Sequence, residues 1–248
     1  MLQQIIDEKW LTANAVIGLF PARSVDCDDI EILDPDTRAP LMTWVGLRQQ
    51  LVKTDKDGNR NPDWALADFI APQDSRVDDY IGAFAVTAGL GIEPHVARFE
   101  AANDDYSAIL LKALADRFAE AFAELMHKRV RTEFWGYATD EALDNEALID
   151  EKYVGIRPAP GYPACPDHTV KRELFELINA PAIGMTLTEG YAMLPTAAVS
   201  GFYFSHPDSR YFGVGKISRD QVESYAQRRG VSLQQAERDL APNLGYNA

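Results

Sequence analysis

The 248-residue sequence predicts an α+β fold in which an antiparallel sheet is flanked by helices. Short apolar segments alternate with turns over residues 14–91, and short turns between successive strands favour antiparallel pairing over parallel crossovers. Residues 93–131 then carry apolar side chains at the helical period. Short capped helices follow in the second half of the chain, which gives the segregated strands and helices of this class.

The expected strands are apolar or alternating runs bounded by turn residues. DDIEIL directs Ile30 and Ile32 to one face and its acids to the other, and DPDTRAP turns the chain toward LMTWVGL. The expected strands are 14–20, 28–33, 41–47, 64–71 and 79–91.

A long helix is expected from Glu93 or Asp104 to Arg131. The residues that share one stripe at the helical spacing are Leu111, Leu114, Phe118, Phe122 and Leu125. Basic residues gather at 127–131, where they complement the negative end of the helix dipole. We expect this cluster to form a local basic patch on an otherwise acidic protein.

The second half begins with RPAPGYPACPDH, residues 157–168, and continues with turn and cap signals. Asp167 or Thr169 can cap a helix over 170–178, and residues 199–217 predict a β-hairpin with HPDSR at its tip. Capping boxes at 218–221 and 232–235 open two short helices. Gly230 ends the first of them.

Charge and composition exclude several classes of protein. The formal net charge of −14 argues against a general nucleic-acid or anionic-membrane surface, and no apolar run is long enough to span a bilayer. The N-terminus has no signal-peptide pattern, and Cys27 and Cys165 form no disulfide framework, as in a reducing, cytoplasmic compartment. We see no repeat or linker and expect one domain over residues 1–248.

The proline-rich segment predicts a stiff extended loop that turns at Gly161. Each proline fixes its own φ and biases the preceding residue toward extended backbone. Arg157 stands at the head of this loop, and its planar guanidinium matches a carboxylate. From the residues alone, a surface arginine that caps nearby carbonyl groups remains the alternative.

Other chemistries find little support in the pattern. Cys165 and His168 make a C-x-x-H pair, but the remaining Cys and His residues lack the spacing of a zinc site. A packed thiol and a helix-capping histidine explain the pair better than a catalytic cysteine does. The glycines near residue 90 lack the dinucleotide-binding spacing, so we expect no metal site and no catalytic residue in this chain.

Five segments together resemble one known family along nearly the whole chain. They are DYIGAFAVTAG, KALADRFAEAFAE, RPAPGYPACPDH, GFYFSHPDSRYF and LAPNLGY. Their sequences and order are similar to those of the C-terminal activation domain of cobalamin-dependent methionine synthase. The resemblance implies a C-shaped α+β domain around a twisted antiparallel sheet. It also implies binding of S-adenosylmethionine, whose methyl group reactivates oxidised cobalamin.

The resemblance carries ligand-binding roles to eight positions of this sequence. Arg157 matches the arginine that binds the carboxylate of S-adenosylmethionine, and Ala159, Gly161 and Tyr162 match the loop that contacts the rest of the ligand. The remaining positions, near the sulfonium or alongside the ligand, are Glu120, Glu151, Tyr211 and Phe212. Helical geometry alone places Glu120 opposite the apolar stripe, as a solvated residue. Phe212 replaces a frequent family tyrosine, so a hydroxyl contact is not expected there.

The resemblance also implies partners. Cobalamin would be carried by a separate module of methionine synthase, and a flavodoxin or flavoprotein reductase would supply electrons. As part of a methyltransferase, this chain alone is not expected to turn over. An aspartate that holds the ligand's amino group lies upstream of the matched region in the family, so we expect an upstream segment to be lacking. The alternative is a degenerate interaction module that docks to a cobalamin protein without useful ligand binding.

Overall fold

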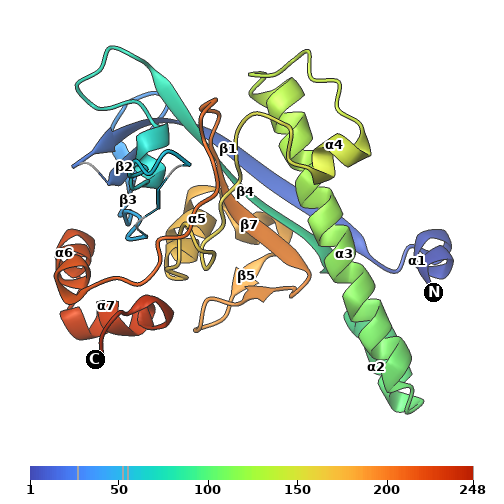
Figure 1. The fold of residues 1–248 in the computed structure, drawn as a ribbon. Coiled ribbons are helices and arrows are strands. Elements are labelled where there is room, and N and C mark those ends of the chain that lie inside the picture. The colour runs from blue at the N-terminus through green and yellow to red at the C-terminus, as the bar shows by residue number, and fades with distance from the viewer. Residues whose placement is uncertain (27, 52, 55, 248) are drawn as a thin grey trace. The chain divides into compact units, whose positions relative to one another are not determined.

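The computed structural model describes residues 1–26, 28–51, 53–54 and 56–247 (Figure 1). It divides into two compact units, and each is described by itself. The first unit comprises residues 1–18, 83–141 and 174–201, and the second comprises 19–82, 142–173 and 202–248. The boundary between the units falls inside three strands and one helix, so single elements contribute residues to both.

The main sheet has five antiparallel strands in the order β3-β2-β1-β4-β7. Their bounds are Thr12–Val25 for β1, Asp29–Leu33 for β2, Pro40–Trp44 for β3, Asp79–Leu90 for β4 and Ala198–Tyr203 for β7. In the register, Ala22 pairs with Ile32, and Ile32 pairs with Met42. Two short strands, β5 (Thr186–Leu187) and β6 (Met193–Leu194), form a separate pair. The predicted fold class is confirmed.

Four of the five expected strands are present, and the exception is residues 64–71. This segment contains a 3₁₀ helix, η1 (Leu66–Phe69), instead of a strand. The carboxylate of Asp68 accepts a hydrogen bond from the Ala65 amide at 2.8 Å, which closes the turn. The Arg48 guanidinium holds the same carboxylate at 2.8 and 2.9 Å. A contact from outside the segment thus supports the turn over an extended strand.

The hairpin expected over 199–217 is half wrong. β7 is its first arm, but residues 210–216 form no strand. The Val214 amide instead donates to the Pro163 carbonyl at 2.9 Å, and Ile217 bridges to Leu244. The segment therefore finds its backbone partners in the proline loop and the C-terminal region.

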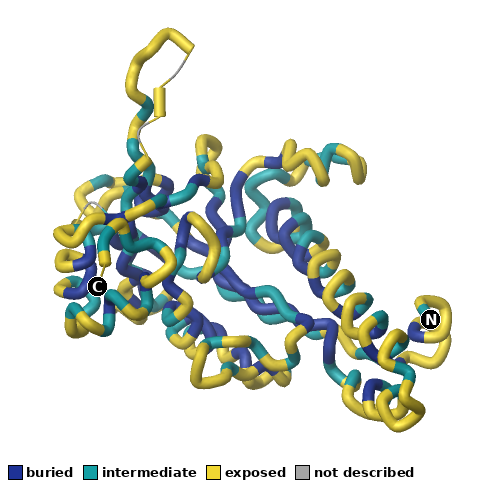
Figure 2. Tube along the Cα trace, turned by 60° about the horizontal axis from the view of Figure 1, so that its bottom comes forward, coloured by how far each residue is buried: buried dark blue, intermediate teal, exposed yellow. Residues whose placement is uncertain are grey.

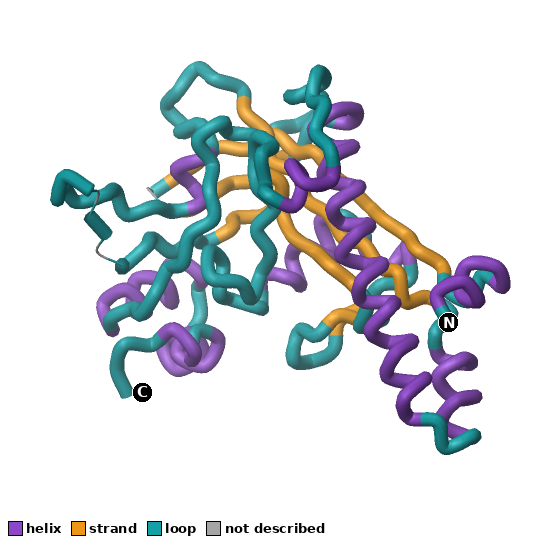
Figure 3. Tube along the Cα trace, turned by 45° about the vertical axis from the view of Figure 1, so that its right-hand side comes forward, coloured by secondary structure: helices purple, strands orange, loops and turns teal. Residues whose placement is uncertain are grey.

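The first unit contains α1 (Leu2–Glu8), α2 (Glu93–Ala101), α3 (Asp105–Arg129) and the π-helical turn η2 (Val130–Phe134). Of the two starts expected for the long helix, Glu93 and Asp104, the structure has the second: α2 ends at Ala101, and the Asp104 carboxylate caps α3 by accepting from the Ser107 amide at 3.0 Å. α2 lies beside the N-terminal part of α3, as Figure 3 shows. Trp10 stacks on His95, with ring centroids 4.5 Å apart, in the core around α1 and α2.

α3 buries a narrower stripe than the sequence suggested. Leu111 is fully buried, but Leu125 is 51% exposed. The buried positions along α3 are mostly alanines, at 108, 115, 119 and 123. Figure 2 shows this buried line beside an exposed outer face, and it shows β4 buried along most of its length. Small residues allow close packing against α3, so the larger apolar side chains flank the contact.

The basic patch expected at 127–131 is wrong. His127 and Arg131 are fully buried. Arg131 pairs with Glu141 inside the first unit, at 2.6 and 2.8 Å. Arg129 remains at the surface and pairs with Glu133 at 2.9 Å. Helical periodicity places adjacent basic residues on different faces, so this run does not form one surface.

The second unit contains the proline loop and most of the remaining helices. Its helices are α4 (Asn145–Ile149), α6 (Arg219–Arg229) and α7 (Leu233–Asp239), with the short 3₁₀ helix η4 (Ala241–Asn243); α5 (Val170–Leu177) crosses the unit boundary, and η3 (Ala180–Ile183) belongs to the first unit. The Ser232 hydroxyl caps α7 by accepting from the Gln235 amide at 3.2 Å. Gly230 ends α6 with φ of 67°, as predicted. Trp44 stacks on Phe202, with centroids 4.3 Å apart, in the core of this unit.

Candidate functional site

The proline loop, residues 157–168, lies in the second unit and is held by backbone hydrogen bonds along its length. The Phe202 amide donates to the Pro158 carbonyl at 3.0 Å, which ties the loop to the end of β7. Inside the loop, the Gly161 amide donates to the Cys165 carbonyl at 2.7 Å. The Cys165 amide donates back to the Tyr162 carbonyl at 2.9 Å and closes a tight turn. The loop is extended at its start and turns at Gly161, as the sequence predicted.

The turn engages the backbone amides of Gly161 and Tyr162, two residues that the family resemblance assigns to ligand contacts. The amide of Gly161 binds Cys165, and the amide of Tyr162 donates to the Ala159 carbonyl at 3.1 Å. Both donors are therefore engaged within the loop in this conformation. Recognition by this segment then depends on side chains and on its remaining backbone groups.

Gly161 is required by two features of the turn. Its φ is +97°, a backbone conformation that L side chains rarely adopt. A Cβ atom at this position would also lie 2.1 Å from Cε1 of His168 and 2.6 Å from its Nδ1. The imidazole thus occupies the side of Gly161 on which other residues carry a side chain. The glycine accommodates His168 on that side, so close approach by a ligand has to come from elsewhere.

Arg157 is oriented by two tyrosines. Its guanidinium donates from Nη1 to the hydroxyl of Tyr153 at 2.8 Å, and its backbone amide donates to the hydroxyl of Tyr211 at 3.0 Å. Tyr153 is 9% exposed, whereas Arg157 is half-buried. A buried phenol therefore fixes the direction of a guanidinium that solvent can reach.

Tyr153 did not emerge from the sequence as a site residue. The only signal was its position four residues before Arg157, which by itself says nothing about contact in an irregular segment. Residues 153–157 follow α4, and within this segment Ile156 forms an antiparallel bridge with Phe204. That contact, together with the buried ring, brings the two side chains together.

Tyr211 and Phe212, which follow the HPDSR segment, lie in different environments. Tyr211 is 44% exposed, and Phe212 is 8% exposed. This agrees with the expectation that at least one of them belongs to the core. Tyr162, on the turn of the proline loop, is 63% exposed. The loop and residue 211 therefore present two phenol rings to solvent in the same unit as Arg157.

The two candidate glutamates lie in different units. Glu151 belongs to the second unit, is exposed and has φ of 52°, just after α4. Its amide donates to the Leu148 carbonyl at 3.1 Å, which closes the helix end. Glu120 is exposed on α3 in the first unit, on the solvated face that helical geometry predicts.

A buried polar network fixes the far end of the loop. Asp167 is 3% exposed and accepts from the amide and hydroxyl of Thr169, at 2.7 and 2.8 Å, and from the Tyr225 hydroxyl. Arg229 binds Glu173 at 2.8 Å and the Thr169 hydroxyl at 3.1 Å. Burial, followed by the charge of Asp167, raises the pKa of Tyr225. This network ties the loop to α5 and α6, so it anchors the turn at Gly161 from one side.

Cys165 is a packed thiol, as expected. It is 5% exposed, and burial raises the pKa of its thiol far above the ordinary range. A neutral buried thiol is a poor nucleophile. The other cysteine, Cys27, lies outside the described residues. Over the part of the chain that the structure describes, no three potential metal ligands gather in one place.

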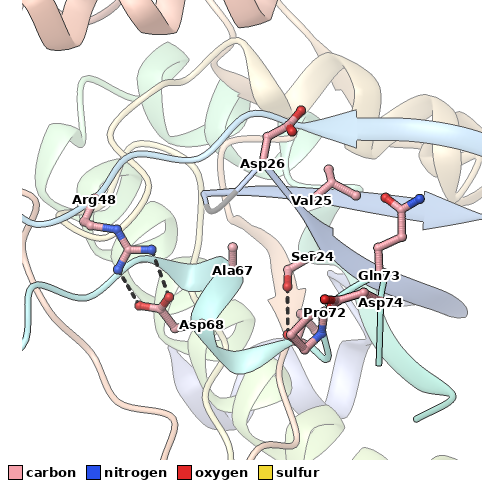
Figure 4. Close-up of a pocket in the computed structure, with 10 residues that line it drawn as sticks. Ser24, Val25, Asp26, Arg48, Ala67, Asp68, Pro72, Gln73 and Asp74 are labelled. Carbon is pink, nitrogen blue, oxygen red and sulfur yellow. Dashed lines mark hydrogen bonds and ion pairs between the residues drawn. The ribbon is translucent and has the colours of Figure 1, made fainter. Parts of the chain in front are cut away.

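A separate cavity of about 800 Å³ lies elsewhere in the second unit. Figure 4 shows the Arg48 guanidinium facing the Asp68 carboxylate at its edge. Its lining comes from residues 24–26, 48, 67–68, 70 and 72–74. None of the eight residues expected to bind a ligand is in this lining. The Arg48 side chain serves η1 here, because Asp68 also caps that turn.

Comparison with known proteins decides the family. The model for the vitamin B12-dependent methionine synthase activation domain matches residues 1–230. The chain belongs to this activation-domain family. It is also similar to a solved structure described as the MetH reactivation domain bound to AdoHcy, with 55% sequence identity and a TM-score of 0.94. The alignment covers 100% of this chain and 75% of that one.

The family assignment agrees with the resemblance that the proline loop and the SHPDS segment suggested. The matched region contains all eight candidate positions of this activation domain, from Glu120 to Phe212. None of the described helices is both long and apolar enough to cross a membrane.

Proposed function

We propose that this activation domain binds S-adenosylmethionine and presents its methyl group for the reductive methylation of cobalamin. The observation that carries the proposal is the Arg157 guanidinium, held at 2.8 Å by the buried Tyr153 at the head of the proline loop. A related structure that is 55% identical over this whole chain has AdoHcy bound, which supports a ligand of the same class.

The residues of the loop suit the amino-acid end of this ligand. A guanidinium binds a carboxylate with two parallel hydrogen bonds, and a fork whose direction is already fixed loses less entropy on binding. Arg157 would hold the carboxylate, while the segment Ala159–Tyr162, with Tyr211 and Phe212, would contact the rest of the ligand. The exposed rings of Tyr162 and Tyr211 offer apolar faces with a polar edge for this purpose.

The sulfonium is the feature that distinguishes S-adenosylmethionine from its product. S-adenosylmethionine supplies a methyl group bonded to a positively charged sulfur. We assign Glu120 and Glu151 to the neighbourhood of that charge, because a carboxylate attracts a sulfonium but gains little from a neutral thioether. Both side chains are exposed in the described structure, so neither requires a buried charge.

The partners follow from the same proposal. Cobalamin would be carried by a separate module of methionine synthase, and a flavodoxin or flavoprotein reductase would supply the electron in the cytoplasm. The chain itself would position the methyl donor, since alignment of the reacting groups contributes a large part of such a rate enhancement. No residue of this chain is assigned a proton-transfer role.

Calorimetric titration with S-adenosylmethionine tests the proposal. Arg157→Ala should weaken binding by about 10- to 150-fold, because hydrogen bonds to charged groups contribute about 1.5–3 kcal/mol. Arg157→Lys should recover part of this loss, since an ammonium keeps the charge but not the fork. Arg38→Ala, an exposed arginine of the same unit, is the matched control and should bind like the parent.

S-adenosylhomocysteine separates charge recognition from shape. Glu120→Gln and Glu151→Gln should weaken S-adenosylmethionine more than they weaken the uncharged product. Equal losses for the two ligands would show that the glutamates act without regard to the sulfonium charge. If the parent chain shows no binding heat at millimolar ligand, the chain acts as an interaction module and the proposal is wrong.

A further inference from the structure

We propose that His168 is a positioning residue for the proline loop. Its neutral imidazole, held by Lys171, rests against Gly161 and keeps the turn at residues 161–165 in the conformation that binds S-adenosylmethionine. The proposal rests on the proposed function, because the turn belongs to the segment assigned to S-adenosylmethionine. It concerns two residues, His168 and Lys171, to which neither the loop motif nor the family assignment gives a role in ligand binding.

The imidazole of His168 is the closest neighbour of the Gly161 side-chain position. A Cβ atom on Gly161 would lie within 2.7 Å of Cε1, Nδ1 and Nε2 of the ring. The ring therefore fills the space beside the glycine and closes that side of the turn. Because Gly161 has a positive φ and little intrinsic preference for one conformation, a neighbour that restricts it has a direct effect on the loop.

Lys171 holds the imidazole in place. Its Nζ lies 2.8 Å from Nδ1 of His168, and Lys171 is only 7% exposed. An ammonium can donate but not accept, so Nδ1 must present its lone pair and the ring proton must be on Nε2. The contact therefore requires a neutral imidazole. A protonated ring would place a second cation against the buried ammonium.

The other charged groups around His168 do not reverse this preference. Burial and then Lys171 lower the pKa of His168, and Asp167 opposes them. The Asp167 carboxylate already accepts from Thr169 and from Tyr225 of α6, and Arg229 on the same helix lies nearby with Glu173 of α5. Burial also lowers the pKa of Lys171. The site therefore favours a neutral histidine.

A lower pH should consequently destabilise the turn of the proline loop. When His168 takes up a proton, Nδ1 can no longer accept from Lys171, and the ring loses the contact that keeps it against Gly161. The turn that follows carries the exposed ring of Tyr162 and is closed by the amides of Gly161 and Cys165. Ligand affinity should therefore fall as the pH drops through the pKa of His168, at most about tenfold per pH unit.

The test compares the pH dependence of S-adenosylmethionine affinity in three forms of the chain. As the pH is lowered from 7.5 through the pKa of His168, which lies below 6.5, the parent should lose affinity by up to about tenfold per pH unit, a coupling to one proton. His168→Gln keeps an acceptor for Lys171 but cannot be protonated. It should bind within about threefold of the parent at pH 7.5 and change less than about twofold over the pH range in which the parent loses affinity.

His206→Gln is the matched control. His206 is exposed, lies in the same unit and makes a similar local contact, with its Nδ1 accepting from the Asp208 amide at 3.1 Å. This variant should keep the parent's pH profile. A His168→Gln profile that matches the parent's would overturn the proposal, although the parent would still bind and the proposed function would stand.

A second measurement needs no ligand. Proton resonances of the His168 ring, followed by NMR from pH 8 to 5, should report a pKa below the ordinary value of 6.5 in the parent. Lys171→Met should raise that pKa, because the neighbouring cation is removed while a chain of similar length remains. An unchanged His168 pKa in Lys171→Met would refute the contact on which the proposal depends.

Discussion

The ion pair between Arg131 and Glu141 gives a stability prediction that requires no ligand. Arg131 is 0% exposed and Glu141 is 6% exposed, and two hydrogen bonds of 2.6 and 2.8 Å join them. Glu141→Gln removes the compensating charge and leaves the guanidinium buried. The guanidinium keeps its proton in proteins, so the uncompensated charge stays in the core. Breaking a buried pair in this way costs about 3–5 kcal/mol.

The neighbouring surface pair supplies the control. Arg129 and Glu133 are 42% and 53% exposed, and they lie 2.9 Å apart on the same helical segment. Solvent screens this pair, so Glu133→Gln should cost no more than about 0.5 kcal/mol. The two substitutions make the same chemical change a few residues apart, so the difference between them isolates burial.

Urea unfolding followed by circular dichroism and tryptophan fluorescence measures both losses. With a slope of about 1–3 kcal/mol per molar urea, Glu141→Gln should lower the midpoint by roughly 1–5 M, and Glu133→Gln should leave it almost unchanged. Arg131→Met combined with Glu141→Leu should recover most of the loss, since the buried charge is then gone. If Glu141→Gln and Glu133→Gln differ by less than about 0.5 kcal/mol, the reasoning from burial is wrong.

Three further outcomes are expected. Tyr153→Phe should weaken S-adenosylmethionine binding by about 2- to 13-fold in calorimetry, because one hydrogen bond that orients Arg157 is lost. The circular dichroism spectrum should stay unchanged, and parent-like affinity would contradict this prediction. Gly46→Ala should lower the melting temperature by about 2–10 °C, because its Cβ would lie 2.0 Å from the Asp28 carbonyl oxygen, whereas Gly190→Ala, which meets nothing within 4 Å, should change it little. In a Cys27→Ser background, burial and the raised pKa of Cys165 should keep its thiol unreactive toward a disulfide reagent at pH 8 until urea unfolds the chain; rapid labelling of the folded protein would refute this.

Local sequence rules determined those features that depend on a residue and its immediate neighbours. The prolines predicted the extended start of the segment 157–168, and Gly161 supplied the positive φ at its turn. Ser232 and Gly230 marked the helix ends where they occur, because caps satisfy backbone groups within a few residues. The apolar run at 79–91 became the buried strand β4. The family could also be read from the order of five segments, and the comparisons confirmed it.

Tertiary contacts decided the features that local rules predicted wrongly or did not reach. Residues 64–71 have a strand-like pattern, yet Leu66–Phe69 form a 3₁₀ turn. The Asp68 carboxylate in this turn binds Arg48, twenty positions away. Residues 210–216 find partners in the proline loop instead of pairing with β7. Backbone groups must be satisfied, but which partner satisfies them depends on what the fold brings near.

The candidate site shows the same division. Sequence alone predicted the stiff loop, because a proline run has properties that need no neighbours, and the family resemblance nominated Arg157 at its head. Only the folded chain places the Tyr153 hydroxyl on that guanidinium and the His168 ring against Gly161. The stiff loop was therefore readable from sequence, whereas the contacts that orient the side chains proposed to bind the ligand depend on packing, which periodicity and composition do not encode.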